Sequence, residues 1–156
     1  MSELTHVDST GAARMVDVTG KDVTARQATA SAKLRTTPEV VALLRGEGMP
    51  KGDALAVARI AGIAAAKRTP DLIPLCHPIA IHGVQVDLAV VDDGVEITTT
   101  VRTADRTGIE MEALTSAAVA GLNLIDMVKA VDPAAVITDV RLEQKLGGKS
   151  GEWNRS

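Results

Sequence analysis

Aromatic residues are almost absent from this sequence. Its 156 residues include no phenylalanine, no tyrosine and one tryptophan, and the net charge is −3. Proteins that bind single-stranded nucleic acid usually stack bases on aromatic rings, and an acidic chain is not drawn to a phosphate backbone. We therefore expect no nucleic-acid partner. Ala, Val, Leu and Ile must fill the core, and because small side chains each bury little area, we expect a homo-oligomer to complete the burial.

Cysteine and long apolar runs are also scarce. Cys76 is the only cysteine, which excludes an intrachain disulfide. The acidic, polar start of the chain does not resemble a signal peptide. The longest apolar run, around residues 60–66, is interrupted by Gly62 and is too short to span a bilayer. We therefore expect a cytoplasmic protein with no membrane partner.

The pattern of apolar residues predicts one α+β domain in which helices cover an antiparallel sheet. Alternating polar and apolar residues predict strands at 85–88 and 95–102, joined by an Asp-Asp-Gly turn at 92–94. Further strands are expected at 15–18, 28–35 and 136–142.

Three helices are expected between these strands. Thr37 followed by Pro38 begins a short helix that ends at Gly46. An alanine-rich helix follows at 53–67, and a longer one at 110–131 ends before a proline. The longer helix has an apolar stripe that is expected to face the core, formed by Met111, Leu114, Ala118, Leu122 and Ile125.

The two ends of the chain differ in composition from its middle. We expect an N-terminal arm at 1–12, a catalytic domain at 13–146 and a flexible glycine-rich tail at 147–156. The sequence Gly-Gly-Lys-Ser-Gly at 147–151 is not a P-loop, because Glu143 stands where that motif needs glycine. The tail is therefore either disordered or closes over an anionic ligand with Lys145 and Lys149.

A thiol and an imidazole sit side by side between two prolines in the sequence Leu-Ile-Pro-Leu-Cys-His-Pro at 72–78. Because each proline restricts its neighbour, we expect Cys76 and His77 in a stiff extended loop, either as an ordinary connector or as part of a site. Neighbours in an extended chain point to opposite faces, so a Cys-His nucleophile pair is not expected. The spacing of these residues and the other histidines matches no zinc motif, and no metal site is predicted.

Several charged residues have both a structural and a functional interpretation. Asp126 and Lys129 form either a surface ion pair or a proton-transfer pair. Glu110, Met111 and Glu112 form an acidic first turn that either complements the helix dipole or contacts a ligand. Six basic residues, each of which alone would be an ordinary solvated group, together suggest a pocket for a phosphorylated ligand: Arg26, Lys51, Lys67, Lys129, Lys145 and Lys149.

Glu112 and Asp126 cannot act on one compact centre from the same chain. They share a helix face but are about 21 Å apart along the axis at 1.5 Å per residue. If both matter, the site is shared between subunits or its ligand is long.

The sequence resembles the cyclic pyranopterin monophosphate synthase family, the second enzyme of molybdenum-cofactor (molybdopterin) synthesis. The resemblance extends from residue 4 to residue 151 and rests on many separate motifs, at 15–18, 24–26, 51–53, 58–67, 72–78, 107–115, 126–131 and 147–151. It implies a ferredoxin-like fold and a hexamer built as a trimer of dimers, with active sites at the dimer interface. Ile125 and Val128 depart from the family pattern, which often has Tyr and Cys there.

The resemblance also implies a lyase reaction. The substrate would be (8S)-3′,8-cyclo-7,8-dihydroguanosine 5′-triphosphate, and the products cyclic pyranopterin monophosphate and diphosphate. No redox cofactor is implied, and whether Mg²⁺ accompanies the phosphates stays open. Asp126, Lys51 and Lys129 would be catalytic. The substrate-binding residues would be Leu75, Cys76, His77, Glu110, Met111, Glu112, Lys67, Arg26, Lys145 and Lys149. The alternative is a non-catalytic nucleotide-binding module of the same fold.

Overall fold

The computed structural model describes residues 4–46 and 53–156. Its main element is one antiparallel sheet. Its strand order is β2-β3-β1-β4-β5, and every neighbouring pair is antiparallel. The strands are β1 (Thr24–Arg35), β2 (Gly83–Val91), β3 (Gly94–Asp105), β4 (Val136–Gly147) and β5 (Trp153–Asn154). The predicted α+β class with an antiparallel sheet is therefore confirmed.

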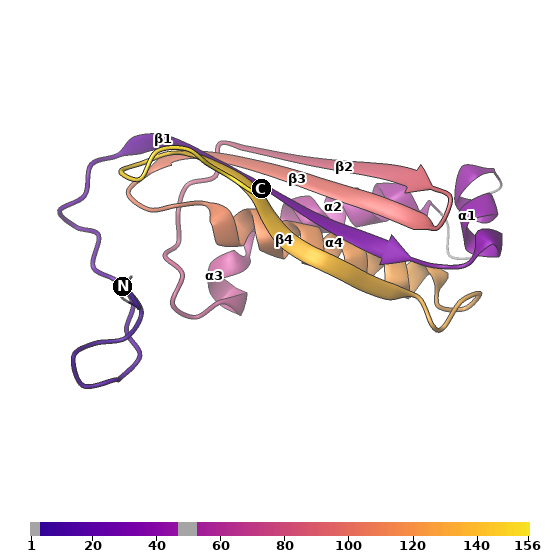
Figure 1. Ribbon diagram of the computed structural model, residues 1–156, viewed down its shortest axis with the longest axis horizontal. Helices are drawn as coiled ribbons and strands as arrows, with labels where there is room; N and C mark the ends of the chain where they lie inside the picture. Colours follow the sequence, from indigo (N-terminus) through magenta and orange to yellow (C-terminus); the bar gives the residue numbers. More distant parts are fainter. Residues whose placement is uncertain (1–3, 47–52) are drawn as a thin grey trace.

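The helices α2 (Ala54–Lys67) and α4 (Glu110–Val128) run side by side in opposite directions against one face of the sheet (Figure 1). The shorter helices are α1 (Pro38–Arg45) and α3 (Thr69–Leu72). The two long helices and four long strands follow a β-α-β-β-α-β order, which is the ferredoxin-like arrangement. The predicted helix start at Thr37 is confirmed, because Thr37 accepts from the backbone N–H of Val40, and Asp53 caps α2 by accepting from that of Ala56.

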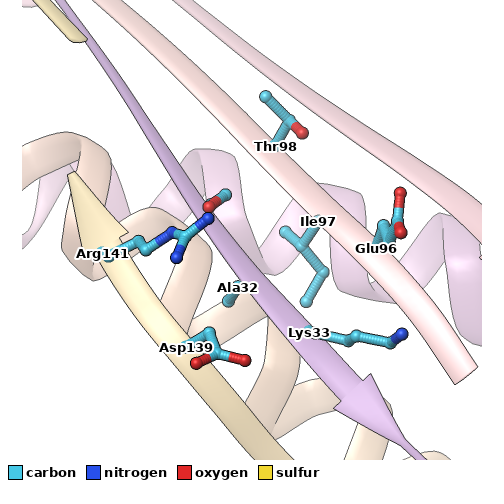
Figure 2. A pocket seen from close by; sticks show the side chains of 8 residues that line it. Ala32, Lys33, Glu96, Ile97, Thr98, Asp139 and Arg141 are labelled. Carbon is cyan, nitrogen blue, oxygen red and sulfur yellow. The ribbon is translucent and has the colours of Figure 1, made fainter. Parts of the chain in front are cut away.

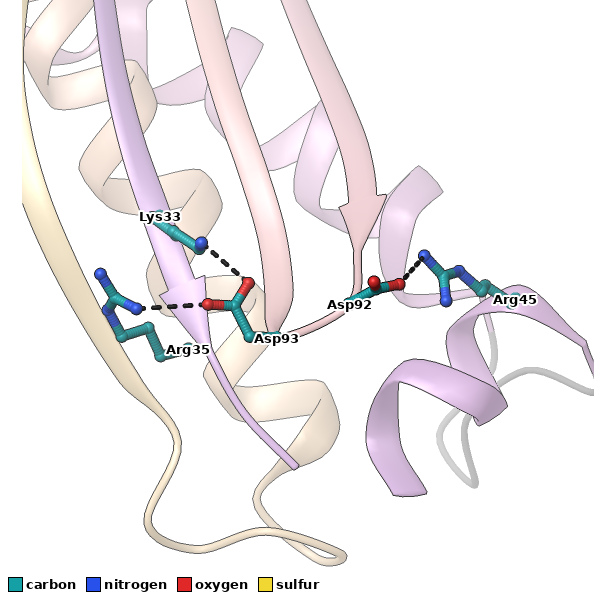
Figure 3. Close-up of polar contacts among 5 residues, drawn as sticks. All are labelled: Lys33, Arg35, Arg45, Asp92 and Asp93. Atoms are coloured by element: carbon teal, nitrogen blue, oxygen red, sulfur yellow. Dashed lines mark hydrogen bonds and ion pairs between the residues drawn. The ribbon is translucent and has the colours of Figure 1, made fainter. Parts of the chain in front are cut away.

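The predicted hairpin is present and longer than expected, because β2 and β3 pair along their whole length around a turn at Asp92 and Asp93. Ion pairs fix this turn to the rest of the fold (Figure 3). Asp93 accepts from Lys33 at 2.8 Å, and Asp92 accepts from Arg45 at 3.2 Å. These exposed pairs join the turn to β1 and α1, and solvent screening makes the contribution of each to stability small.

The predicted core face of α4 is only partly right, because Leu114 and Ile125 of the expected stripe pack half-buried against the core. Met111 and Leu122 of the expected stripe are 36% and 56% exposed. The helix instead buries Ala113, Ala117, Ala120, Gly121 and Leu124 against the sheet and α2. Small residues lie there because the elements approach closely: a Cβ added at Gly121 would lie 3.1 Å from the Ile137 side chain. Close packing favours a face made mostly of small residues, and Met111 and Leu122 are left outside.

Other boundaries also differ from the sequence predictions. Residues 15–18 form no strand, and β1 begins at Thr24 instead of residue 28. α4 ends at Val128, three residues early, and α3 was not expected. β4 continues to Gly147, and the tail then turns back so that Trp153 pairs with Lys145. The predicted flexibility of the tail stays a prediction.

The composition of α4 bears on the expectation that the protein has no membrane partner, which stays a prediction. On length and composition α4 is long and apolar enough to cross a bilayer. However, 56% of its apolar window is buried inside the fold, as is usual for the core helix of a soluble domain.

Candidate active site

Three pockets surround the loop that joins β3 to α4, at the end of the sheet where β1 begins and β4 finishes. The acidic pocket, of about 130 Å³, is lined by His6, Leu75, Cys76, His77, Thr107, Gly108, Glu110, Met111 and Glu112. The basic pocket, of about 360 Å³, is lined by Lys21, Arg26, Thr107, Gly108, Glu110, Lys145, Lys149 and Ser150. The arm pocket, of about 340 Å³, is lined by Val16, Asp17, Val18, Thr19, His77 and Arg106.

Shared walls join the three pockets into one surface. Glu110 belongs to both the acidic and the basic pocket, and His77 belongs to both the acidic and the arm pocket. The structure therefore brings together nine of the predicted substrate-binding residues: Arg26, Leu75, Cys76, His77, Glu110, Met111, Glu112, Lys145 and Lys149.

Glu112 is the most buried charged group in this surface. It is the third residue of α4, in the first turn of the helix, and is only 3% exposed. Burial, with a smaller contribution from the nearby charge of Glu110, raises the pKa of its carboxyl to about 7. A carboxyl with this pKa exchanges a proton readily near neutral pH, which suits a general acid or base.

Cys76 and His77 both line the acidic pocket, and His77 also lines the arm pocket. The chain is not extended here, because the backbone N–H of Cys76 donates to the Ile73 carbonyl at 3.0 Å and closes a turn. Burial raises the pKa of the Cys76 thiol, and Glu112 and Glu110 raise it further. The thiol therefore stays protonated at neutral pH, which agrees with a wall residue and not with a nucleophile.

His77 holds the segment that follows the N-terminal arm. Its Nε2 lies 2.5 Å from the carbonyl oxygen of Val16. Because a carbonyl can only accept, Nε2 carries the proton of this bond, and in the neutral ring Nδ1 is then the acceptor. This contact explains why residues 15–18 form no strand: their backbone is used by the site.

A β-bulge places Lys145 in the basic pocket. β4 has one extra residue, Glu143, where the register of its pairing with β1 shifts. Because alternate residues of a strand point to opposite faces, the shift reverses the direction of every following side chain. Lys145 therefore pairs with the buried Ala28 on the helix-covered face, and its Nζ lies 3.1 Å from Oε1 of Glu110.

Glycines let the tail close around Arg26. Gly147 and Gly148 have φ angles of 84° and 76°, in the left-handed region that favours glycine. A Cβ at Gly148 would lie 2.3 Å from Nη1 of Arg26, so no side chain fits without moving the guanidinium. The turn carries Lys149 and Ser150 to the wall of the basic pocket.

Among the described residues, Lys67, Asp126 and Lys129 do not line these pockets. Lys67 ends α2 as an exposed residue and lines none of the three pockets. Asp126 and Lys129 form an ion pair at the far end of α4, where both side chains are about half exposed. Lys51 lies outside the described residues.

Sequence reasoning missed several pocket residues. Thr107, Gly108 and Ser150 lie inside the segments that carried the family resemblance, so a signal for them existed. Lys21 and Arg106 gave none, because single basic residues in polar segments are common. His6 was considered only as a metal ligand, and its place in the acidic pocket depends on how the arm folds back.

A fourth pocket, of about 300 Å³, lies on the sheet over β1, β3 and β4 (Figure 2). Its basic residues already have acidic partners, because Lys33 pairs with Asp93 at 2.8 Å and Arg141 pairs with Glu143 at 2.7 Å. Glu96 and Asp139 add negative charge to the same wall. This pocket is therefore a poor site for an anionic ligand.

Comparison with known proteins agrees with the geometry. A profile of the MoaC family matches residues 15–148. A protein named cyclic pyranopterin monophosphate synthase from Streptomyces coelicolor is 72% identical over 98% of this chain and 90% of its own. A protein of the same name from Nocardioides sp. is 68% identical over 97% of this chain and 95% of its own. Cyclic pyranopterin monophosphate synthase 2 of Mycobacterium tuberculosis is 60% identical over 98% of this chain and 92% of its own. This chain belongs to the MoaC family.

Proposed function

We propose that this chain is a cyclic pyranopterin monophosphate synthase, a lyase of molybdenum-cofactor biosynthesis. It would convert (8S)-3′,8-cyclo-7,8-dihydroguanosine 5′-triphosphate into cyclic pyranopterin monophosphate and diphosphate. The observation that carries the proposal is the basic pocket placed directly beside the acidic pocket, with Glu110 in the wall of both. One molecule that carries a heterocycle and a phosphate chain can occupy both at once.

The basic pocket supplies the clamp for the phosphate chain. Arg26, Lys145 and Lys149 converge on it from β1, β4 and the tail, and Lys21 adds a fourth positive charge. Hydrogen bonds from charged donors to phosphate are stronger than neutral ones, and the same donors stabilise the diphosphate as it leaves. The ion pair between Lys145 and Glu110 orients Lys145 before the ligand binds.

The acidic pocket supplies groups that exchange protons with the heterocycle. Opening the five-membered ring of the purine and closing the pyran ring both need acids and bases. Glu112, with a pKa of about 7, is suited to either role at neutral pH. His77 and Met111 are further wall residues against which the heterocycle would lie.

Lys51, Asp126 and Lys129 are proposed to carry the remaining proton transfers, as the family resemblance implies. Asp126 pairs with Lys129 at the C-terminal end of α4, and Glu112 lies at its N-terminal end. The 14 residues between Glu112 and Asp126 amount to about 21 Å of helix. A single subunit therefore offers two half-sites.

Two-fold packing of α4 against a second copy would unite these half-sites. Two antiparallel α4 helices place the Glu112 end of one subunit beside the partner subunit's Asp126. The outer face of the helix layer suits such a contact, because Ile60 of α2 and Leu122 of α4 are 68% and 56% exposed. We propose on this basis a homo-oligomer with sites at the dimer interface, arranged as a hexamer.

The proposed reaction is redox-neutral and needs no redox cofactor. We propose that it takes place in the cytoplasm. A direct comparison of turnover with and without a chelator decides whether Mg²⁺ accompanies the phosphates.

The proposal is tested by incubating the purified protein with the cyclised triphosphate and following diphosphate release and product mass. Release of diphosphate together with cyclic pyranopterin monophosphate is expected. The competing function, a non-catalytic nucleotide-binding module, predicts that the substrate binds and is recovered unchanged. Lys51→Ala is the matched control, since it should bind the substrate and release no diphosphate.

A further inference from the structure

The N-terminal arm folds into a small hairpin that presents one side chain to the acidic pocket. Val7 and Ala13 form a β-bridge, and the backbone N–H of Arg14 donates to the His6 carbonyl at 2.8 Å. Asp8 closes the tip, because its Oδ1 accepts from the backbone N–H of Ala12 at 3.0 Å. The backbone of His6 is therefore held by the hairpin and not left as a loose end.

The segment that follows the hairpin is attached to the pocket walls at two points. His77 contacts the Val16 carbonyl, and Nε of Arg106 donates to the Lys21 carbonyl at 3.2 Å. These contacts place the hairpin beside the site. His6 is the residue of the 4–14 segment that reaches the wall of the acidic pocket, together with Cys76 and Glu112.

The size and chemistry of the acidic pocket indicate what the His6 side chain can bind there. A volume of about 130 Å³ corresponds to about four water molecules at roughly 30 Å³ each, so a ring that enters it lies close to every wall. The other titratable walls are two carboxyls, a thiol and the imidazole of His77, whose Nε2 already contacts the Val16 carbonyl. His6 adds a second imidazole with a donor and an acceptor, which suits the ring nitrogens and exocyclic groups of a purine-derived heterocycle.

We propose that His6 is a substrate-contacting residue of the acidic pocket, whose imidazole hydrogen-bonds the heterocycle. This inference rests on the proposed function. The family profile begins at residue 15, so His6 lies outside the segment that it matches. The arm thus adds to the site a group that the family match alone does not point to.

The first test separates contact with the heterocycle from contact with the phosphates. His6→Ala should raise KM for the cyclised triphosphate about tenfold, which is the effect of losing one hydrogen bond near the upper end of its usual range. The inhibition constant of inorganic triphosphate, which fills only the basic pocket, should stay unchanged. His6→Asn, which keeps a donor and an acceptor, should recover part of the loss.

Two control variants show that the effect is specific. Thr5→Ala changes an exposed arm residue and keeps the carbonyl that accepts from Arg14. His82→Ala removes an exposed histidine outside the three pockets. Both should have the parent's KM. A purely structural role of His6 would instead weaken binding of the substrate and of inorganic triphosphate alike.

A second readout does not depend on turnover. Diethyl pyrocarbonate should modify His6 in the free protein, and the cyclised triphosphate should protect it, whereas inorganic triphosphate should not. Parent-like KM for His6→Ala together with no protection would overturn the role of His6 and leave the proposed function standing. A parent protein that neither binds nor converts the substrate would overturn both.

Discussion

Lys145 and Glu110 form an ion pair with Nζ 3.1 Å from Oε1, and this pair lies on the boundary between the basic and acidic pockets. Its two members are 35 residues apart in sequence, on β4 and at the start of α4. The bulge at Glu143 makes the pair possible, since without it Lys145 would point to the uncovered face of the sheet. One irregular residue in a strand thus decides which charges meet in the site.

Glu112→Gln should make stability less dependent on pH. The pKa of Glu112 is about 7 in the folded protein, against an ordinary value of 4.5. Between pH 4.5 and pH 7 the folded state therefore keeps a proton on this carboxyl that the unfolded chain has lost. The carboxyl therefore costs no stability below pH 4.5 and destabilises increasingly as pH rises to about 7. The difference in free energy of unfolding between the variant and the parent should be about 2 kcal/mol more favourable to the variant at pH 8 than at pH 5. Urea denaturation at fixed protein concentration measures this difference.

The control for this prediction is Glu96→Gln, which changes an exposed carboxyl on β3. It should shift stability by a similar small amount at both pH values. An equal effect of Glu112→Gln at pH 5 and pH 8 would contradict the raised pKa.

Lys149→Ala should weaken substrate binding and leave the fold intact. Its side chain lines the basic pocket, and loss of one charged hydrogen bond to phosphate corresponds to a roughly 10- to 100-fold increase in KM. The increase should shrink as salt concentration rises. Steady-state kinetics at two salt concentrations measures both effects, with Arg45→Ala on α1 as the control. Equal KM values for the two variants would remove Lys149 from the phosphate clamp.

Gly148→Ala tests how closely the tail wraps Arg26. Gly148 has a φ of 76°, and a new Cβ would lie 2.3 Å from the guanidinium. Gly151→Ala is a matched control, since Gly151 has a φ of 69° and nothing within 4 Å of its added Cβ. Both changes strain the backbone by about 1 kcal/mol, and only the first displaces Arg26. KM should therefore rise in Gly148→Ala well beyond its value in Gly151→Ala, while similar KM values would show that Arg26 tolerates the displacement.

The raised pKa of Cys76 predicts an unreactive thiol. Burial is the main cause, and the negative charges of Glu112 and Glu110 add to it. Iodoacetamide at pH 7.5 should alkylate Cys76 more slowly than it alkylates glutathione, as mass spectrometry of the intact protein would show. The Glu112→Gln variant should react faster than the parent. Alkylation of the parent at the rate of glutathione would contradict this account.

The sequence predicted the features that depend on local chemistry. The Thr37 and Asp53 caps and the turn at Asp92 and Asp93 follow from single residues and their neighbours, and the structure confirms them. The core face of α4 was not predictable in this way, because the helix is apolar on both sides. Which side is buried depends on how closely Gly121 can approach Ile137 of β4.

The site was predictable in part for the same reason. Most of its residues lie in segments that resemble the family, and the pockets contain them. The bulge at Glu143 and the turn that aims Cys76 and His77 into one pocket arise from pairing and packing between distant segments. No local pattern in the sequence encodes these.

The central claim is that one subunit carries two half-sites at opposite ends of α4, about 21 Å apart. Glu112→Gln and Asp126→Asn should each abolish turnover alone. When they are unfolded together and co-assembled, each mixed dimer has one intact site and one doubly damaged site. Random mixing should therefore restore about a quarter of the parent's activity. No recovery, with mixed oligomers verified by native mass spectrometry, would contradict the shared site and show that both residues act within one chain.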